Sequence, residues 1–255
     1  MLNYEKTGPR ADLTINQPEK RNPLSNETML QLLAALREAA SDPDVLVIVI
    51  TGTGDKAFSA GGDLSGGFLD EALASHGERA AFADLFRVMR RCGKPIVARV
   101  NGHALAGGFG LAAACDIVIA VEDATFGTPE ILVGLWPMMI SAILQRLMPQ
   151  RAAMELMMTG RRISAQDAVD LGVVSRVVDR GGLDDAVDET VAALLRQSPA
   201  QLKLGKDAFY AVEDMDFDTA LDHLLTGLTA VGMTEDAAEG VAAFVEKRKP
   251  DWKGR

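Results

Sequence analysis

The chain has 255 residues, of which 48% are hydrophobic and 24% charged, and its formal net charge is −10. This length supports one large domain or two smaller ones, with an ample buried core. The acidic balance argues against nucleic acid or an anionic membrane as a partner, although local lysines and helix N-termini can still hold an anionic ligand.

The compartment is predicted from the N-terminus and the cysteines. Residues 1–10, MLNYEKTGPR, carry no basic-then-apolar signal pattern, and no apolar run reaches the ~18 residues of a membrane span. Cys92 and Cys115 lie in apolar contexts, without the further closely spaced ligands of a zinc site or a disulfide framework. These features predict reduced thiols and a cytoplasmic protein.

The first predicted elements in chain order are two strands with a helix between them. Residues 11–17, ADLTINQ, alternate like a half-buried strand, and residues 45–50, VLVIVI, form a β-branched run typical of a strand covered on both faces. Residues 25–42 predict a helix with Ser25 or Asn26 as its N-cap. Its apolar stripe comprises Met29, Leu32, Leu33, Leu36 and Ala40.

Further strands follow along the first two thirds of the chain. Residues 95–100 and 116–121 are apolar runs like that at 45–50, and residues 173–178 form a weaker one. Because helical patterns separate these strands, parallel crossovers and a mixed α/β core are predicted.

From residue 137 onward the chain carries successive amphipathic helix patterns, broken by glycine, proline or capping residues. Helices that end a chain in this way often cover a neighbour's site or build an oligomer interface. The predicted helical segments are 137–148, 150–160, 164–172, 183–197, 199–212, 216–231 and 235–248.

Two glycine-rich stretches follow predicted strands: TGTGDKAFSAGGDL at 51–64 and NGHALAGGFGLAAACD at 101–116. Each leads from a strand through small residues to a helix start, where backbone N–H groups lack partners. If two such groups converge on one oxygen they form an oxyanion hole, but the spacing alone leaves ordinary surface turns as an alternative.

The second glycine stretch also fits a dinucleotide fingerprint, and we reject this interpretation. Gly108, Gly110 and Ala113 have the fingerprint spacing, and Glu130 lies twenty residues after Gly110. However, the preceding strand ends well before Gly108, whereas the fingerprint occupies the strand-to-helix turn itself.

Five blocks of the sequence resemble, in order, blocks of the crotonase, or enoyl-CoA hydratase/isomerase, superfamily. They are AFSAGGDL (57–64), NGHALAGGFGLAAACDIVIA (101–120), FGTPEILVGL (126–135), SAQDAVDLGVVSRVV (164–178) and AFVEKRKPDWKGR (243–255).

The resemblance implies an α/β fold, a crotonase-like spiral of ββα units over residues 1–195 with a C-terminal helical trimerisation region over residues 196–255. It implies a coenzyme A thioester as the substrate, with no separate cofactor and no metal. It also implies a homotrimer or a dimer of trimers.

By this resemblance, the backbone N–H groups of Gly62 and Gly107 hold the thioester oxygen as it becomes an enolate. Glu130, in FGTPE, is the implied catalytic acid/base. Without the resemblance, a glutamate at this place would be interpreted as a surface residue near a helix start. A carboxylate that faces an apolar pocket is expected to have a raised pKa.

The chain departs from the two-glutamate hydratases of this family. Gly110 occupies the position of their first glutamate, and the apolar residues LWPMMI (135–140) replace a glycine-rich turn. Gly110, Trp136 and Met138 are the candidate residues of the substrate pocket. Trp136 and Met138 would line its acyl part, with core packing as the alternative. A single carboxylate favours Δ3/Δ2-enoyl-CoA isomerisation. A hydratase or lyase with a non-glutamate second group, and a non-catalytic acyl-CoA-binding homologue, remain open.

The family positions also imply residues that bind coenzyme A. They are Lys20, Arg21, Lys56 and Ala60, and Lys247, which the family supplies from a neighbouring subunit.

The remaining polar candidates are expected to have structural or surface roles. Asp63 caps a turn, Asp116 pairs with a basic residue, and His103 fixes the turn before the glycines. His76 lies at the surface and His223 on a late helix.

Overall fold

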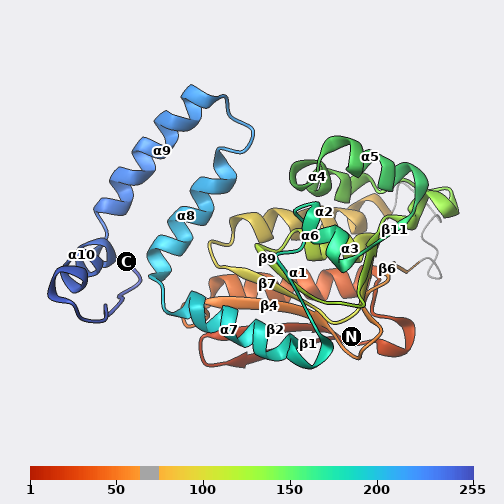
Figure 1. Ribbon diagram of the computed structural model, residues 1–255, viewed down its shortest axis with the longest axis horizontal. Coiled ribbons are helices and arrows are strands. Elements are labelled where there is room, and N and C mark those ends of the chain that lie inside the picture. Colours follow the sequence, from red (N-terminus) through yellow and green to blue (C-terminus); the bar gives the residue numbers. More distant parts are fainter. Residues whose placement is uncertain (64–74) are drawn as a thin grey trace.

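The computed structural model describes residues 1–63 and 75–255 (Figure 1). Its largest sheet has six strands in the order β1-β2-β4-β7-β9-β12, with β1 and β2 antiparallel and the remaining neighbours parallel. The strands are β1 (Leu2–Thr7), β2 (Arg10–Ile15), β4 (Val47–Gly52), β7 (Ile96–Val100), β9 (Ile117–Val121) and β12 (Arg176–Val178).

The parallel strands and their crossovers confirm the predicted α/β organisation, whereas β1 was not predicted. Every residue of β4 is buried, as its unbroken β-branched run indicates. Helix α1 (Asn26–Ser41) begins after Ser25, whose Oγ accepts a hydrogen bond from the Thr28 N–H at 3.2 Å. It packs against α2 (Ser75–Arg91), and α7 (Leu183–Leu195) contacts β4, β7 and β9.

A smaller sheet has the order β11-β10-β8-β5, and its strands alternate along the chain with those of the large sheet. Each of β4, β7 and β9 leads into a short strand of this sheet and then into a helix, which is the predicted repeat of ββα units. A further short pair, β3 (Pro23–Leu24) with β6 (Gly61–Gly62), lies beside it. The smaller sheet consists of β5 (Ala57–Ser59), β8 (His103–Leu105), β10 (Thr125–Gly127) and β11 (Arg162–Ser164).

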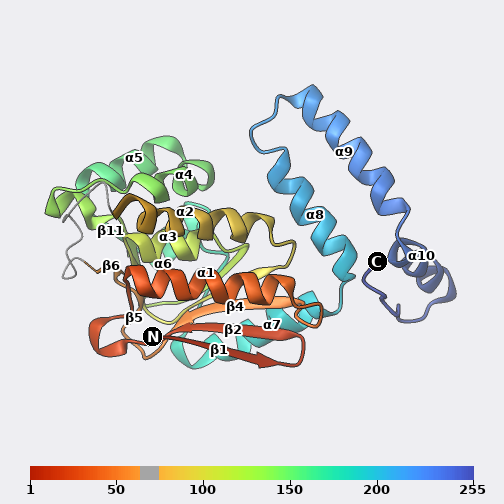
Figure 2. The same cartoon turned by 180° about the vertical axis from the view of Figure 1, so that it is seen from behind.

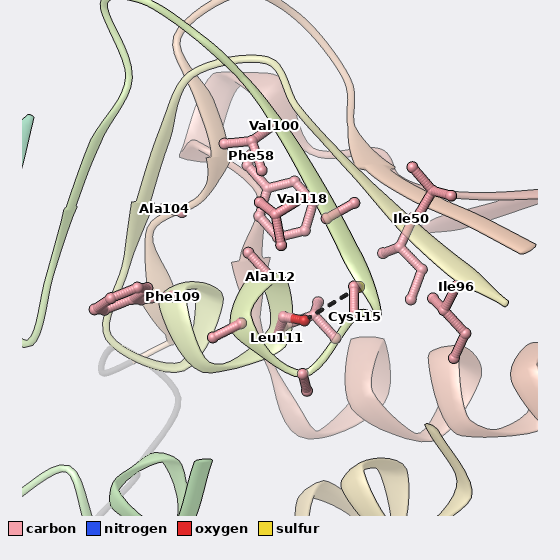
Figure 3. Close-up of a cluster of buried hydrophobic side chains, with 14 of the residues drawn as sticks. Ile50, Phe58, Ile96, Val100, Ala104, Phe109, Leu111, Ala112, Cys115 and Val118 are labelled. Atoms are coloured by element: carbon pink, nitrogen blue, oxygen red, sulfur yellow. Dashed lines mark hydrogen bonds between the residues drawn. The ribbon is translucent and has the colours of Figure 1, made fainter. Parts of the chain in front are cut away.

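Apolar side chains from both sheets surround the short helix α3 (Gly107–Ala113), as Figure 3 shows. The ring of Phe109 lies 5.5 Å from that of Phe126 on β10. The thiol of Cys115 is buried and donates to the Leu111 carbonyl at 3.5 Å (Figure 3). Cys115 and the half-buried Cys92 are free thiols, as predicted.

The predicted C-terminal helices are all present, and α8, α9 and α10 project from the body of the protein in Figures 1 and 2. No residue of α9 is buried. None of the helices in the described ranges is long and apolar enough to cross a membrane. The remaining helices are α4 (Met138–Leu147), α5 (Gln150–Thr159), α6 (Ala165–Asp170), α8 (Pro199–Ala211), α9 (Phe217–Gly232) and α10 (Glu235–Glu246), with 3₁₀ turns at Pro18–Lys20, Pro129–Val133 and Arg180–Gly182.

Asp116 joins the projecting helices to the body of the protein. Its carboxylate accepts hydrogen bonds from the Lys206 ammonium at 2.7 Å, the Tyr210 hydroxyl at 2.9 Å and the Ile96 N–H at 2.7 Å. This confirms that Asp116 pairs with a basic residue. The burial of Tyr210 and the adjacent carboxylate raise the pKa of its hydroxyl well above the ordinary value.

Candidate active site

The turn before α3 has an unusual backbone conformation that directs the start of the helix. Ala106 has φ 50° and ψ −128°, a region that L-residues rarely occupy. Its N–H donates to the Gly127 carbonyl at 2.9 Å, and its own carbonyl accepts from Phe109 and Gly110. Because Gly107 is the first residue of the helix, its N–H has no acceptor within the helix. It is therefore available as a donor at the edge of the core.

The second glycine turn lies directly against this one. Gly61 has φ +92°, and a Cβ atom placed on it would lie 2.5 Å from the Ala106 Cβ and 3.2 Å from the Gly107 nitrogen. At Gly62 the corresponding Cβ position meets no atom within 4 Å among the described residues. The structure thus places Gly62 and Gly107, 45 residues apart in the sequence, on adjoining turns.

Glu130 is brought to the same edge of the smaller sheet. Strands β8 and β10 run parallel, with Gly127 paired to Leu105, so both chains leave the sheet at the same end. Glu130 lies three residues beyond β10, in the 3₁₀ helix Pro129–Val133, just as Gly107 lies two residues beyond β8. The strand register therefore explains why the predicted carboxylate and the glycine turn are neighbours.

The environment of Glu130 suits an acid/base. Its Oε2 is buried and has no hydrogen-bond partner within residues 1–63 and 75–255. Burial raises the pKa of Glu130 above its ordinary value, and its own backbone N–H offsets part of that rise. A carboxyl group whose pKa is raised in this way is suited both to accept a proton and to return it.

The side of Gly110 that faces away from its helix is filled by Ile140 of α4. A Cβ atom on Gly110 would lie 2.1 Å from Ile140 Cγ2 and 2.7 Å from Ile140 Cβ. The Ile140 side chain is buried. The position that the resemblance assigns to the first glutamate of the two-glutamate hydratases is therefore closed by an aliphatic side chain here.

Gly110→Ala is expected to lower the free energy of unfolding by about 1–3 kcal/mol, because the added methyl group overpacks the contact with Ile140. In an open helix the same change would stabilise by about 1 kcal/mol, so the sign itself tests the contact. Chemical denaturation of the single and double variants with Ile140→Ala measures it. The double variant should lose less free energy of unfolding than the sum of the losses in the two single variants. A loss equal to that sum would show that the two positions do not touch.

The two residues proposed for the acyl pocket differ in exposure. Trp136 is half-buried and packs against the core, whereas Met138 begins α4 with its side chain 71% exposed. A role for either in binding an acyl chain remains a prediction.

Three of the residues implied for coenzyme A lie near one another. The Ala60 N–H donates to the Arg21 carbonyl at 2.9 Å, and Arg21 and Lys56 line one cavity of about 550 Å³. Lys20 is exposed beside Arg21. Lys247 follows α10, which lies on the opposite side of the chain from β6 in Figures 1 and 2. Within one chain it does not join the others.

Sequence reasoning missed two further cations in that cavity. Arg162 and Arg180 line it together with Asp55, Gly102, His103 and Asp123. Nη2 of Arg180 lies 2.7 Å from both carboxylate oxygens of Asp123. Neither arginine belongs to a recognisable motif. Arg162 lies on β11 and Arg180 in the turn after β12, and only the topology brings these two elements to the cavity.

The other polar candidates mostly have the roles expected of them. Nδ1 of His103 is hydrogen-bonded to the Thr125 hydroxyl at 2.9 Å, which ties the glycine turn's strand to β10. Asp63 is partly exposed, and His76 and His223 are exposed.

Comparison with known proteins places these features in context. The sequence profile described as "Enoyl-CoA hydratase/isomerase" matches residues 8–255. The chain is 36% identical to a carnitinyl-CoA dehydratase of Salmonella enteritidis, over 100% of this chain and 98% of the relative.

Two crystal structures have closely similar folds. An enoyl-CoA hydratase of Mycobacterium smegmatis superposes with a TM-score of 0.95 at 34% identity, covering 98% of each chain. An enoyl-CoA hydratase of Geobacillus kaustophilus gives a TM-score of 0.93 at 32% identity, covering 100% of this chain and 98% of the other.

Proposed function

Because this chain belongs to the enoyl-CoA hydratase/isomerase family and has the crotonase fold, we propose that it converts an acyl-CoA thioester through an enolate, most specifically by Δ3/Δ2-enoyl-CoA isomerisation. Glu130 is the single acid/base of this reaction. Gly62 and Gly107 supply the backbone N–H groups that hold the thioester oxygen.

The chemistry balances with one carboxylate. Glu130 removes a proton from C2 of a 3-enoyl thioester, and the C–H electron pair moves into the carbonyl to give a dienolate. The two backbone N–H groups stabilise the negative oxygen by hydrogen bonding in a site with little water. Glu130 then returns the proton to C4, which leaves the double bond between C2 and C3.

The observation that carries this choice is the contact of Ile140 with Gly110. Hydration needs a second group that holds water opposite Glu130. Here the side chain of Ile140 fills the space at Gly110 where such a group would begin. Isomerisation needs no second carboxylate, because one group can take a proton and give it back.

A second candidate is a lyase that adds or removes water using Glu130 and a non-glutamate group. The similarity to a carnitinyl-CoA dehydratase over the full chain favours it. A homologue that binds acyl-CoA without turnover is the remaining possibility.

Incubation with 3-enoyl-CoA and with 2-enoyl-CoA in separate reactions distinguishes the three possibilities, with the isomers separated by liquid chromatography and the products identified by mass spectrometry. We expect interconversion of the two isomers without change of mass. Gain of one water by the 2-enoyl thioester, with no isomerisation, would replace the isomerase proposal by the lyase. Inertness toward thioesters of several chain lengths would favour the binding homologue.

The phosphates of coenzyme A are proposed to lie near Arg21 and Lys56, since the cavity gathers cations on a chain of net negative charge. Arg162 also lines this cavity, whereas the Arg180 guanidinium there already donates to the Asp123 carboxylate and the Asn101 carbonyl.

We propose assembly as a homotrimer, or a dimer of trimers, through the projecting helices. They expose large apolar side chains that a single chain leaves uncovered, among them Phe217 at 76%, Leu225 at 65% and Phe244 at 85% exposure. A neighbouring copy would cover these side chains and bring Lys247 to the coenzyme A site. The predicted cytoplasmic location fits the free thiols of Cys92 and Cys115.

A further inference from the structure

Two buried side-chain oxygens have no hydrogen-bond partner in the described part of the chain, and they are two residues apart. They are Thr128 Oγ1 and Glu130 Oε2. Thr128 is completely buried, with 0% of its surface exposed. Burying a hydroxyl without a partner costs about 1–3 kcal/mol, so such a group calls for a physical explanation.

Helix capping does not explain the hydroxyl. Thr128 is the N-cap residue of the 3₁₀ helix Pro129–Val133, where a threonine side chain ordinarily accepts a backbone hydrogen bond. Its side chain makes no such bond, and the next residue, Pro129, has no N–H to donate. Valine has nearly the same shape, so packing alone does not require a threonine here.

The position of Thr128 connects it to the candidate site. It directly follows Gly127, whose carbonyl accepts from the Ala106 N–H and so fixes the turn that leads to Gly107. Two peptide units separate Thr128 from Glu130, which puts their Cα atoms at most about 7 Å apart.

Among the described residues, Thr128 Oγ1 and Glu130 Oε2 are buried, unpaired oxygens of the kind that an internal water molecule pairs. The two oxygens do not bond each other directly, since both lack partners. Buried waters typically bridge polar groups that the protein leaves unpaired, making two to four hydrogen bonds.

We propose that Thr128 is a positioning residue whose hydroxyl holds, together with Glu130 Oε2, one water molecule that orients the Glu130 carboxylate toward C2 of the thioester. The inference rests on the proposed role of Glu130 and applies to any reaction that passes through it. The water donates one hydrogen bond to the carboxylate and forms a second hydrogen bond with the threonine hydroxyl. The carboxylate is thereby stabilised in its charged form and held in one rotamer.

The test compares Thr128→Val, which removes the hydroxyl and keeps the shape, with Thr128→Ser, which keeps the hydroxyl. Thr128→Val is expected to lower kcat about 10- to 100-fold with little change in KM, because a hydrogen bond to a charged group is lost. The acid limb of the kcat/KM profile should move to higher pH. Thr128→Ser should retain most of the rate and the original acid limb.

Two results would overturn the inference. One is a Thr128→Val enzyme with wild-type kcat and an unmoved acid limb. The other is a Thr128→Ser enzyme as impaired as Thr128→Val, which would assign the role to the methyl group. Should Thr128→Val not fold, Thr128→Ala removes the same hydroxyl without adding volume and is judged by the same criteria.

Glu130→Gln separates this inference from the proposed function. Loss of turnover in Glu130→Gln together with a fully active Thr128→Val would leave the acid/base standing and remove only Thr128. Full activity in Glu130→Gln would remove the acid/base itself.

Discussion

Glu130→Gln is expected to lower kcat by about 10²–10⁴-fold while acyl-CoA binding stays close to that of the wild type. The amide has nearly the shape of the carboxyl group but cannot take a proton from carbon. Steady-state rates measure the first effect, and calorimetric titration with a saturated acyl-CoA measures the second. A variant that turns over at the wild-type rate would exclude Glu130 as the acid/base.

The pH dependence follows from the environment of the same residue. Burial is the main cause of its raised pKa, and its own backbone N–H is the opposing one. Since catalysis needs the carboxylate as base, kcat/KM should fall as the pH drops through this raised pKa, above the ordinary value of about 4.3.

Glu130→Gln should raise the stability of the fold although it lowers activity. Above the raised pKa the folded wild type carries a buried charge that the glutamine variant lacks, so Glu130→Gln should unfold at the higher temperature. As the pH falls toward the ordinary glutamate pKa, protonation removes that cost and the difference should vanish. A difference that stays constant across this window would show that burial does not disfavour the charge.

Gly61→Ala is expected to lower kcat by about 10²–10³-fold, the effect of losing one oxyanion donor. The added methyl group would lie 2.5 Å from the Ala106 Cβ and 2.9 Å from the Leu105 carbonyl oxygen, at a residue with φ +92°. The two glycine turns must then move apart, and the backbone strain should also lower the free energy of unfolding by about 1–3 kcal/mol.

The neighbouring glycine provides the matched control. At Gly62 a Cβ atom meets nothing within 4 Å in the described structure, and φ is not positive. Gly62→Ala adds the same methyl group without that contact, so it should keep most of the free energy of unfolding. An equal loss of stability in the two alanine variants would show that the close approach of Gly61 to Ala106 does not strain the backbone.

Much of the fold could be predicted because its longer elements carry periodic patterns. The β-branched run of β4 and the amphipathic helices toward the C-terminus appear where their patterns indicate. Strands of two or three residues, such as β5 and β6, have no period to detect. The antiparallel β1 was missed, since its exposed residues LNYEKT do not resemble a buried strand.

The candidate site was predictable only in part. Motif resemblance marked Gly62, Gly107 and Glu130, but their proximity depends on the register of β8 and β10, which spacing does not encode. The contact between Gly110 and Ile140 joins residues from separate helices, and the lack of a partner for the Thr128 hydroxyl within the described ranges depends on tertiary packing, which no sequence motif encodes.

Removal of a C2 hydrogen by Glu130 is the step on which the proposed chemistry depends. It can be measured directly with 3-enoyl-CoA carrying two deuterium atoms at C2, followed by NMR. The wild type is predicted to remove one deuterium from C2, more slowly than it removes hydrogen, and Glu130→Gln to leave both in place. Products that retain both deuterium atoms at C2, or equally fast removal by the variant, would contradict the proposed enolate mechanism.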